Sequence, residues 1–68
     1  MTITIEEEYI RLDNLLKFAG TVDTGGQAKF AIQNGEVLLN GEICTQRGKK
    51  IKPGDIVKFR NSEIEIRN

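Results

Sequence analysis

Two short helices, each ended by a glycine, are the feature that most limits how this chain can fold. Between Arg11 and Ala19 the apolar side chains recur at i, i+3, i+4 and i+7, which is the spacing of one helical face, and Gly20 follows as a stop. The pattern predicts a helix over residues 11–19 with an apolar face and an exposed polar stripe. The apolar face consists of Leu12, Leu15, Leu16 and Ala19, and the polar stripe of Arg11, Asn14 and Lys17.

A second helix is predicted to begin at the sequence Thr24-Gly25-Gly26-Gln27. This sequence fits a capping box, in which the Thr24 side chain accepts a hydrogen bond from an amide of the first turn while Gln27 reaches back. Gly35 is expected to end the helix. The inner face is Ala28, Ala31 and Ile32, and the polar sides carry Gln27, Lys29 and Gln33. Because few residues join the two helices, we expect them to pack as a pair.

Short strands are predicted on both sides of the helices. Residues 2–5 alternate threonine and isoleucine, and residues 56–59 follow a proline-glycine turn. Residues 63–66 alternate strictly between glutamate and isoleucine, as a half-buried edge strand does. The order of one strand, two helices and several antiparallel strands predicts an α+β fold.

A hairpin is predicted between residues 36–39 and residues 43–45, because Asn40 and Gly41 between them both tolerate positive φ. A two-residue loop would set Leu39 opposite Glu42, whereas a three-residue loop would set Leu39 opposite Ile43. The three-residue loop is favoured, because it keeps the apolar side chains on one face and a single buried face fixes the register.

The length and composition limit the possible functions. The 68 residues are 38% hydrophobic and 29% charged, so we expect one soluble globular domain over residues 1–68. No apolar run is long enough to span a membrane, and the N-terminus is acidic where a secretory signal would be basic, so a cytoplasmic location is expected. The chain has no histidine and one cysteine, which excludes disulfides, zinc sites and His-dependent catalysis. We expect Cys44 to be a small packed residue, and the chain to have no cofactor and no enzymatic activity.

The net charge of zero conceals an uneven distribution of charge. Residues 44–60 carry a charge of +5, whereas residues 1–10 carry −3. Nucleic-acid phosphates respond to the local potential within about 8–10 Å in physiological salt, so a locally basic surface binds them even when the total charge is zero. The basic run between Arg47 and Lys52 therefore indicates a nucleic-acid ligand, although exposed loops are also commonly charged.

The start of the second helix is a further candidate for phosphate binding. The sequence Thr24-Gly25-Gly26 presents unpaired backbone N–H groups and the positive end of a helix dipole. The two glycines could equally serve a tight connection and close helix packing, and both interpretations stay open at this point.

The four aromatic residues, Tyr9, Phe18, Phe30 and Phe59, are too few to indicate a base-stacking platform of the kind found in single-strand-binding proteins. They are expected to lie mostly in the core. Phe18 and Phe30 are the ambiguous pair, because each lies beside the apolar stripe of its helix.

Four motifs in a fixed order resemble a known family. They run from Ile10 to Leu16, from Thr24 to Ile32, from Gly35 to Gly41, and from Lys52 to Val57. In this order, and over a core motif of residues 10–59, they resemble the RNA-binding domain of ribosomal small-subunit protein four, the S-four or alpha-L domain. Because the whole chain is one such module, it is similar to the free-standing bacterial subgroup of YaaA/YbcJ-like proteins.

The resemblance implies two helices packed on a small, bent antiparallel sheet, with structured RNA lying across the helices and the loop after the hairpin. The family often has an arginine where Gly25 stands, so a guanidinium contact with phosphate is absent there. Weaker binding, or contact through backbone amides, is implied at this position. The residues that would contact RNA are Arg11, Asn14 and Lys17 from the first helix, Thr24, Gln27 and Lys29 from the second, and Arg47, Lys49 and Lys50 from the loop.

The residues and the resemblance together predict a non-catalytic, monomeric protein that binds structured RNA, with ribosomal RNA and ribosome assembly as the expected context. The alternative is a protein-interaction adaptor, in which the edge strand of residues 63–66 pairs with a partner and the basic loop meets an acidic protein surface. No small-molecule substrate and no membrane partner are expected. An RNA-modifying enzyme would need a catalytic domain that this chain does not encode.

Overall fold

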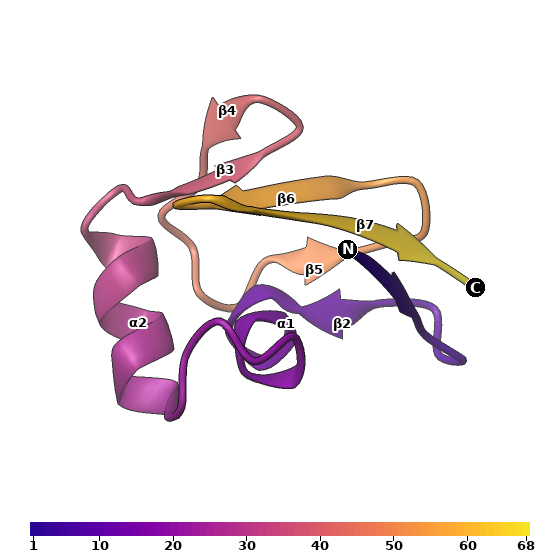
Figure 1. Ribbon diagram of the computed structural model, residues 1–68, viewed down its shortest axis with the longest axis horizontal. Helices are drawn as coiled ribbons and strands as arrows, with labels where there is room; N and C mark the ends of the chain where they lie inside the picture. Colours follow the sequence, from indigo (N-terminus) through magenta and orange to yellow (C-terminus); the bar gives the residue numbers. More distant parts are fainter.

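The computed structural model describes all 68 residues and contains two helices, a five-stranded sheet and a separate two-stranded ladder (Figure 1). In chain order the elements are β1 (Thr2–Thr4), β2 (Ile10–Arg11), α1 (Leu12–Phe18), α2 (Gly25–Gln33), β3 (Val37–Leu39), β4 (Glu42–Ile43), β5 (Lys50–Ile51), β6 (Ile56–Phe59) and β7 (Ser62–Arg67). The strand order in the large sheet is β1-β7-β6-β3-β4, and β2 pairs with β5. The predicted α+β class is confirmed.

Both helices form where the sequence predicts them. α1 buries the three leucines of its apolar face, and Gly20 follows with a φ of 76°. Thr24 caps α2 by accepting a hydrogen bond from the Gln27 amide at 3.1 Å. The Gln27 side chain accepts from the amide of Asp23 at 2.7 Å, one residue before the cap, and Gly35 with a φ of 78° follows the helix. Neither helix could cross a bilayer.

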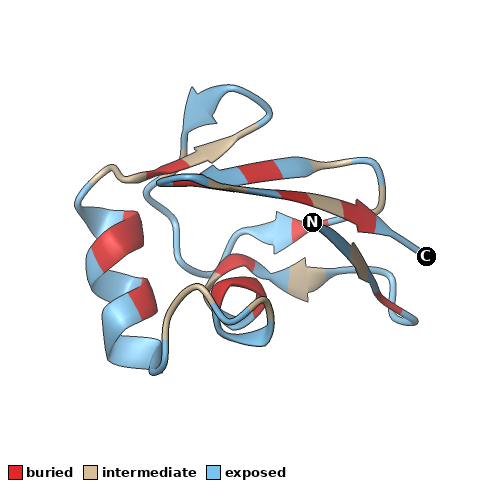
Figure 2. Cartoon of the chain, in the orientation of Figure 1, coloured by how far each residue is buried: buried red, intermediate tan, exposed pale blue.

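The hydrophobic core lies between the helix pair and the inner face of the large sheet (Figure 2). All 13 buried residues are hydrophobic, so no polar side chain needs a partner inside the molecule. β6 and β7 contribute alternate residues to this core, as the period of a strand requires. Cys44 is partly buried and packs against the core, as expected. The buried residues of β3, β6 and β7 are Val37, Val57, Phe59, Ile64 and Ile66.

One pair of strands departs from the predicted antiparallel sheet. β1 runs parallel to β7, with Ile3 opposite Ile66, so the large sheet is mixed. The N-terminal ammonium group donates to the carbonyl of Glu63 at 2.6 Å, and the amide of Ile5 donates to the carbonyl of Arg67 at 2.8 Å. Alternation of threonine and isoleucine specifies that one face of β1 is buried, but it does not specify the direction in which the strand runs.

The prediction that residues 63–66 form an edge strand is wrong. β7 lies between β1 and β6, so its backbone is paired on both sides. Strict alternation indicates a buried face, here Ile64 and Ile66, but does not indicate whether a strand has one neighbour or two. The adaptor alternative required a free edge on this strand, and β1 occupies that edge.

The hairpin register also differs from the favoured one. Leu39 lies opposite Glu42, so the loop has two residues, Asn40 and Gly41, with φ values of 51° and 88°. The prediction assumed that Ile43 would be buried on the inner face, but its side chain is 65% exposed. β4 is the edge strand of the large sheet (Figure 1) and neither of its residues is buried, so burial does not fix its register and the turn does.

Only one of the four aromatic rings belongs to the core. Phe59 is 2% exposed, whereas Tyr9 is 40% exposed and Phe18 and Phe30 are each 68% exposed. The expectation that the aromatic residues lie mostly in the core is therefore wrong. Each helix fills its inner face with leucine, isoleucine or alanine at the i+3 and i+4 positions, which leaves its phenylalanine outside.

Asn40 is expected to stabilise the hairpin in two separable ways. Its side chain donates to Asp55 Oδ1 at 3.0 Å and accepts from the Ile56 amide at 2.9 Å, and its φ is positive. Asn40→Gly removes both hydrogen bonds but keeps the turn conformation, and should lower the free energy of unfolding by about 1–2 kcal/mol. Asn40→Ala adds backbone strain and should cost about 1 kcal/mol more. Urea unfolding measures both variants, and equal stabilities would show that strain at this residue is negligible.

Candidate nucleic-acid interface

The loop after the hairpin, residues 44–49, is anchored on the start of α1. The amide of Leu12 donates to the carbonyl of Lys49 at 2.9 Å, and the amide of Asp13 donates to the carbonyl of Arg47 at 3.0 Å. The first amides of a helix have no acceptor within the helix, and the residue before α1, Arg11, provides no side-chain cap. The loop carbonyls therefore take the place of a capping side chain, and the helix holds the basic loop beside its own first turn.

The ladder between β2 and β5 brings two cations together. Arg11 lies opposite Lys50, and the neighbouring pair contains Ile51, which is fully buried and fixes the ladder to the core. The Arg11 guanidinium lies against Gly48, where a Cβ atom would be 3.6 Å from Nη2. The Lys50 ammonium lies 4.9 Å from the centre of the Tyr9 ring, a cation–π contact. Arg11, the loop backbone and Lys50 thus form one exposed cluster.

Arg11 also forms an ion pair with Asp13, with 3.2 Å between Nη2 and Oδ2. The Arg11 side chain remains 48% exposed, so its guanidinium can still contact a ligand. A hollow of about 420 Å³ beside it is lined by Glu7, Tyr9, Ile10, Arg11 and Asn14. Asn14 therefore shares a surface with Arg11, as predicted, and Glu7 marks the acidic border of that surface.

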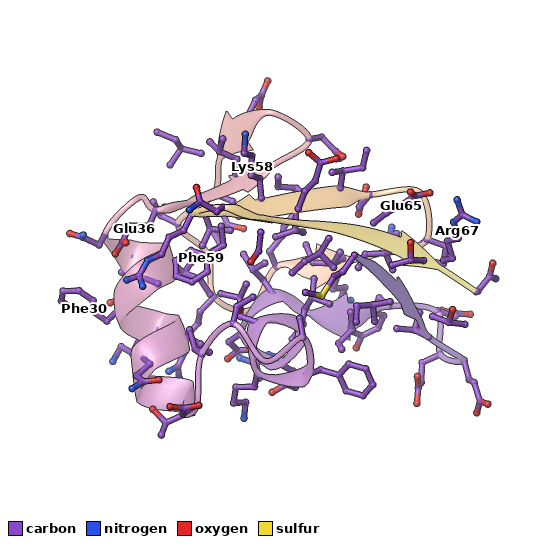
Figure 3. The ribbon with its side chains drawn as sticks, in the orientation of Figure 1. Phe30, Glu36, Lys58, Phe59, Glu65 and Arg67 are labelled. Carbon is purple, nitrogen blue, oxygen red and sulfur yellow. The ribbon has the colours of Figure 1, made fainter.

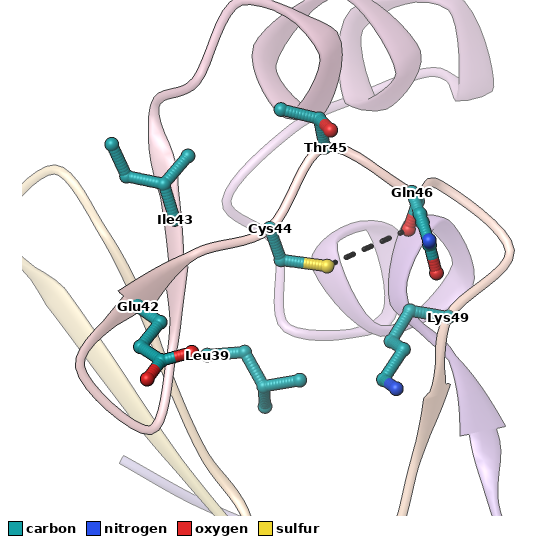
Figure 4. Close-up of a pocket in the computed structure, with 7 residues that line it drawn as sticks. All are labelled: Leu39, Glu42, Ile43, Cys44, Thr45, Gln46 and Lys49. Atoms are coloured by element: carbon teal, nitrogen blue, oxygen red, sulfur yellow. Dashed lines mark hydrogen bonds between the residues drawn. The ribbon is translucent and has the colours of Figure 1, made fainter.

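Lys49 lies on the other side of the loop from Lys50. Its side chain extends toward a hollow of about 280 Å³ between the loop and the hairpin (Figure 4). Leu39, Glu42 and Cys44 also line this hollow, and the Cys44 thiol lies 3.9 Å from the carbonyl of Gln46. The structure therefore joins the backbone of Lys49 to the Arg11 cluster but directs its ammonium group toward the hairpin.

The end of α1 meets the start of α2. The Lys17 Nζ lies 3.9 Å from the point that a Cβ atom on Gly25 would occupy, so a cation stands beside the N-terminus of α2. The N–H groups of Gly25 and Gly26 donate to no acceptor in the protein. Lys17 is thus the cation nearest to the position where the sequence lacks an arginine.

The two polar sides of α2 face in different directions. Lys29 lies one turn after Gly25, on the flank that faces Lys17. Gln27 lies on the opposite flank, where it lines a groove with Phe30 and Arg60, and its side-chain oxygen already accepts from the Asp23 amide. The structure therefore places Lys29 on the side of Lys17 and separates Gln27 from it.

The basic run of residues 44–60 does not form one patch. Arg60 pairs with Glu36 at 3.5 Å, and Lys58 lies opposite Glu63 in the sheet. Figure 3 shows Lys58 projecting from β6 on the face away from the helices. Only the part of the run in the anchored loop and β5 joins Arg11. We call the exposed residues of the anchored loop, β2, β5 and the adjoining ends of the two helices together the cationic face; they are Arg11, Asn14, Lys17, Gly25, Arg47 and Lys50.

Two features of this surface were not predicted from the sequence. Tyr9 supports Lys50 through its ring, and Phe18 is exposed next to Lys17. A signal existed for Phe18, because it lies outside the i, i+3, i+4 pattern of α1. No comparable signal existed for Tyr9, whose contact depends on the pairing of β2 with β5.

Comparison with known proteins gives two close sequence relatives. "Probable ribosome maturation protein RlbA" of Bacillus subtilis (strain 168) is 41% identical over 57 residues, which cover 84% of this chain and 80% of RlbA. YbcJ of Escherichia coli (strain K12) is 34% identical over 58 residues, which cover 85% of this chain and 83% of YbcJ.

Two solved structures are also similar to this chain. The solution structure of YbcJ, described as having an alpha-L motif involved in RNA binding, matches with a TM-score of 0.76 at 31% identity and covers 98% of this chain and 86% of that chain. A pseudouridylate synthase matches with a TM-score of 0.73 at 28% identity, over 82% of this chain but only 24% of the enzyme. The family model of the S4 domain matches residues 3–67. The resemblance drawn from the four motifs is thereby confirmed: the chain belongs to the S4 domain family.

Proposed function

We propose that this protein binds structured RNA, in particular ribosomal RNA, through the cationic face, and that it acts in ribosome assembly. The observation that carries the proposal is the anchoring of the basic loop on α1, which holds Lys50 opposite Arg11 and the backbone of Arg47 at the first turn of the helix. The relatives support it, since RlbA is named a ribosome maturation protein and the YbcJ motif is described as involved in RNA binding.

The groups of the cationic face suit the RNA backbone. Arg11 and Arg47 carry planar guanidinium groups that can bind phosphate through two parallel hydrogen bonds, whereas Lys17 and Lys50 act as point charges. The free N–H groups at the start of α2 can donate to a phosphate oxygen. Such contacts position the protein on RNA, and the fold of the RNA, with its 2′-hydroxyl groups, supplies selectivity.

The acidic turn of residues 6–8 restricts the direction from which RNA can approach the cationic face. Glu7 lines the hollow beside Arg11, so negative charge borders the cationic face on one side. A phosphate backbone would be repelled from this border and attracted to the face, which favours one approach of the RNA. A protein of zero net charge can in this way bind a polyanion.

The proposal contains no catalytic step. The pseudouridylate synthase that resembles this chain shares only the small S4 domain with it, so the similarity does not extend to the rest of that enzyme. We propose that residues 1–68 act as one RNA-binding unit, as a monomer in the cytoplasm. The nine residues named from the sequence stay candidates, with Lys49 and Gln27 in the least favourable positions.

Binding to ribosomal RNA is expected to fall steeply with salt. If the four cations Arg11, Lys17, Arg47 and Lys50 each neutralise one phosphate, log K should fall against log salt with a slope of about −3 to −4. Filter binding of purified ribosomal RNA over a range of potassium chloride concentrations measures this slope. Binding that does not change with salt would contradict the proposal.

Lys50→Gln is expected to weaken RNA binding about 3- to 10-fold and to reduce the salt slope by about 1, because one phosphate contact is lost. Lys58→Gln is the matched control, since it removes the same charge from an exposed lysine on the opposite side of the sheet. The same filter assay compares the two variants. Equal losses from both would show that the total charge matters and the cationic face does not.

A further inference from the structure

Phe18 places an exposed aromatic ring within reach of the cationic face. Its side chain is 68% exposed, directly follows Lys17 and lies one helical turn after Asn14. Lys17 and Phe18 therefore flank Asn14 on the outer surface of α1. Exposure of such a ring to water is unfavourable, so a partner that covers it would be stabilised.

The other aromatic rings have different surroundings. Phe59 is buried and lies 4.8 Å below the Arg60 guanidinium, and Tyr9 lies under the Lys50 ammonium. Phe30 is as exposed as Phe18, but it lines the groove beside Arg60, and Figure 3 shows it pointing outward on the far side of α2. Phe30 likewise follows a lysine without an ion pair, Lys29, but only Phe18 lies one helical turn from Asn14, which shares a hollow with Arg11.

We propose that Phe18 stacks on an unpaired base of the bound RNA, while Lys17 and Asn14 contact the adjoining sugar-phosphate backbone. The inference rests on the proposed function and adds a substrate class to it: folded RNA with an unstacked nucleotide beside a paired segment. Every base presents a π-face, so an aromatic ring accepts any of them, and the charge beside the ring selects nucleic acid over an apolar protein surface. Loops and bulges of structured RNA offer such bases.

A tryptophan at position 18 would report stacking directly. The chain has no tryptophan, so Phe18→Trp introduces a single fluorescent indole that can still stack. Phe30→Trp is the matched control, because the two phenylalanines are equally exposed at 68% and lie on different helices. The probes are ribosomal RNA purified from bacterial ribosomes and a fully paired RNA duplex at equal nucleotide concentration. We expect ribosomal RNA to quench Trp fluorescence strongly in Phe18→Trp and weakly in Phe30→Trp, and the duplex to quench neither.

A second variant tests the energetic role of the ring. Phe18→Ala should weaken the binding of ribosomal RNA about 5- to 100-fold, the range found for loss of one stacked base, and Phe18→Tyr should retain it. The salt slope should stay unchanged in Phe18→Ala, because no phosphate contact is removed. This unchanged slope separates the loss of stacking from a loss of charge.

The outcomes distinguish the two proposals. If ribosomal RNA binds to Phe18→Trp without quenching it, or quenches Phe30→Trp equally, stacking at Phe18 is refuted and RNA binding stands. If neither the wild type nor any variant binds ribosomal RNA, both proposals fail. A change in sedimentation coefficient in Phe18→Ala would assign the ring to a contact between copies of the chain and would also overturn the stacking proposal.

Discussion

Two backbone hydrogen bonds between the start of α1 and the loop after the hairpin are the interaction on which the candidate interface depends. They satisfy the amides of Leu12 and Asp13, which have no acceptor within the helix, and they fix the carbonyls of Arg47 and Lys49. A basic loop without such anchors would sample many conformations and would lose that freedom on binding. Because the loop backbone is already held, less conformational entropy is lost when its cations bind a ligand.

The fold, and not the order of residues, produces the charge separation of this neutral chain. On the sheet side the cations have acidic neighbours: Arg60 pairs with Glu36 at 3.5 Å, and Arg67 with Glu65 at 2.9 Å. On the helix side Arg11 pairs with Asp13 at 3.2 Å, but Lys17 and the cations of the loop form no ion pair. The core between the two sides is purely apolar, so charges on one side are held away from those on the other.

The parts of the fold that depend on neighbouring residues could be predicted from the sequence. The leucine spacing fixed α1, and Thr24 and Gln27 form cap hydrogen bonds at the start of α2. The parts that depend on distant residues could not. The place of β7 in the sheet depends on β1, which comes from the other end of the chain. Likewise, the exposure of Ile43 depends on how far the helices extend over the sheet, which no pattern within the hairpin encodes.

In the candidate site, too, the features set by nearby residues could be predicted and those set by distant residues could not. Residue type identified Arg11, Lys17, Arg47 and Lys50 as candidates, and the family resemblance supplied the expectation that they share a surface. The proximity of Arg11 to Lys50 and to the backbone of Arg47 comes from the β2–β5 ladder and from the anchored loop, which join segments about 40 positions apart. The opposite directions of Lys49 and Lys50 are likewise a product of the backbone path through the loop into β5.

Amide hydrogen exchange at Leu12 and Asp13 tests the anchoring of the loop most directly. The position of these amides at the start of the helix means that any protection must come from the carbonyls of Lys49 and Arg47. The account predicts that both amides exchange about as slowly as the amide of Leu16 inside the helix. Exchange as fast as that of Gly48 in the exposed loop would contradict it.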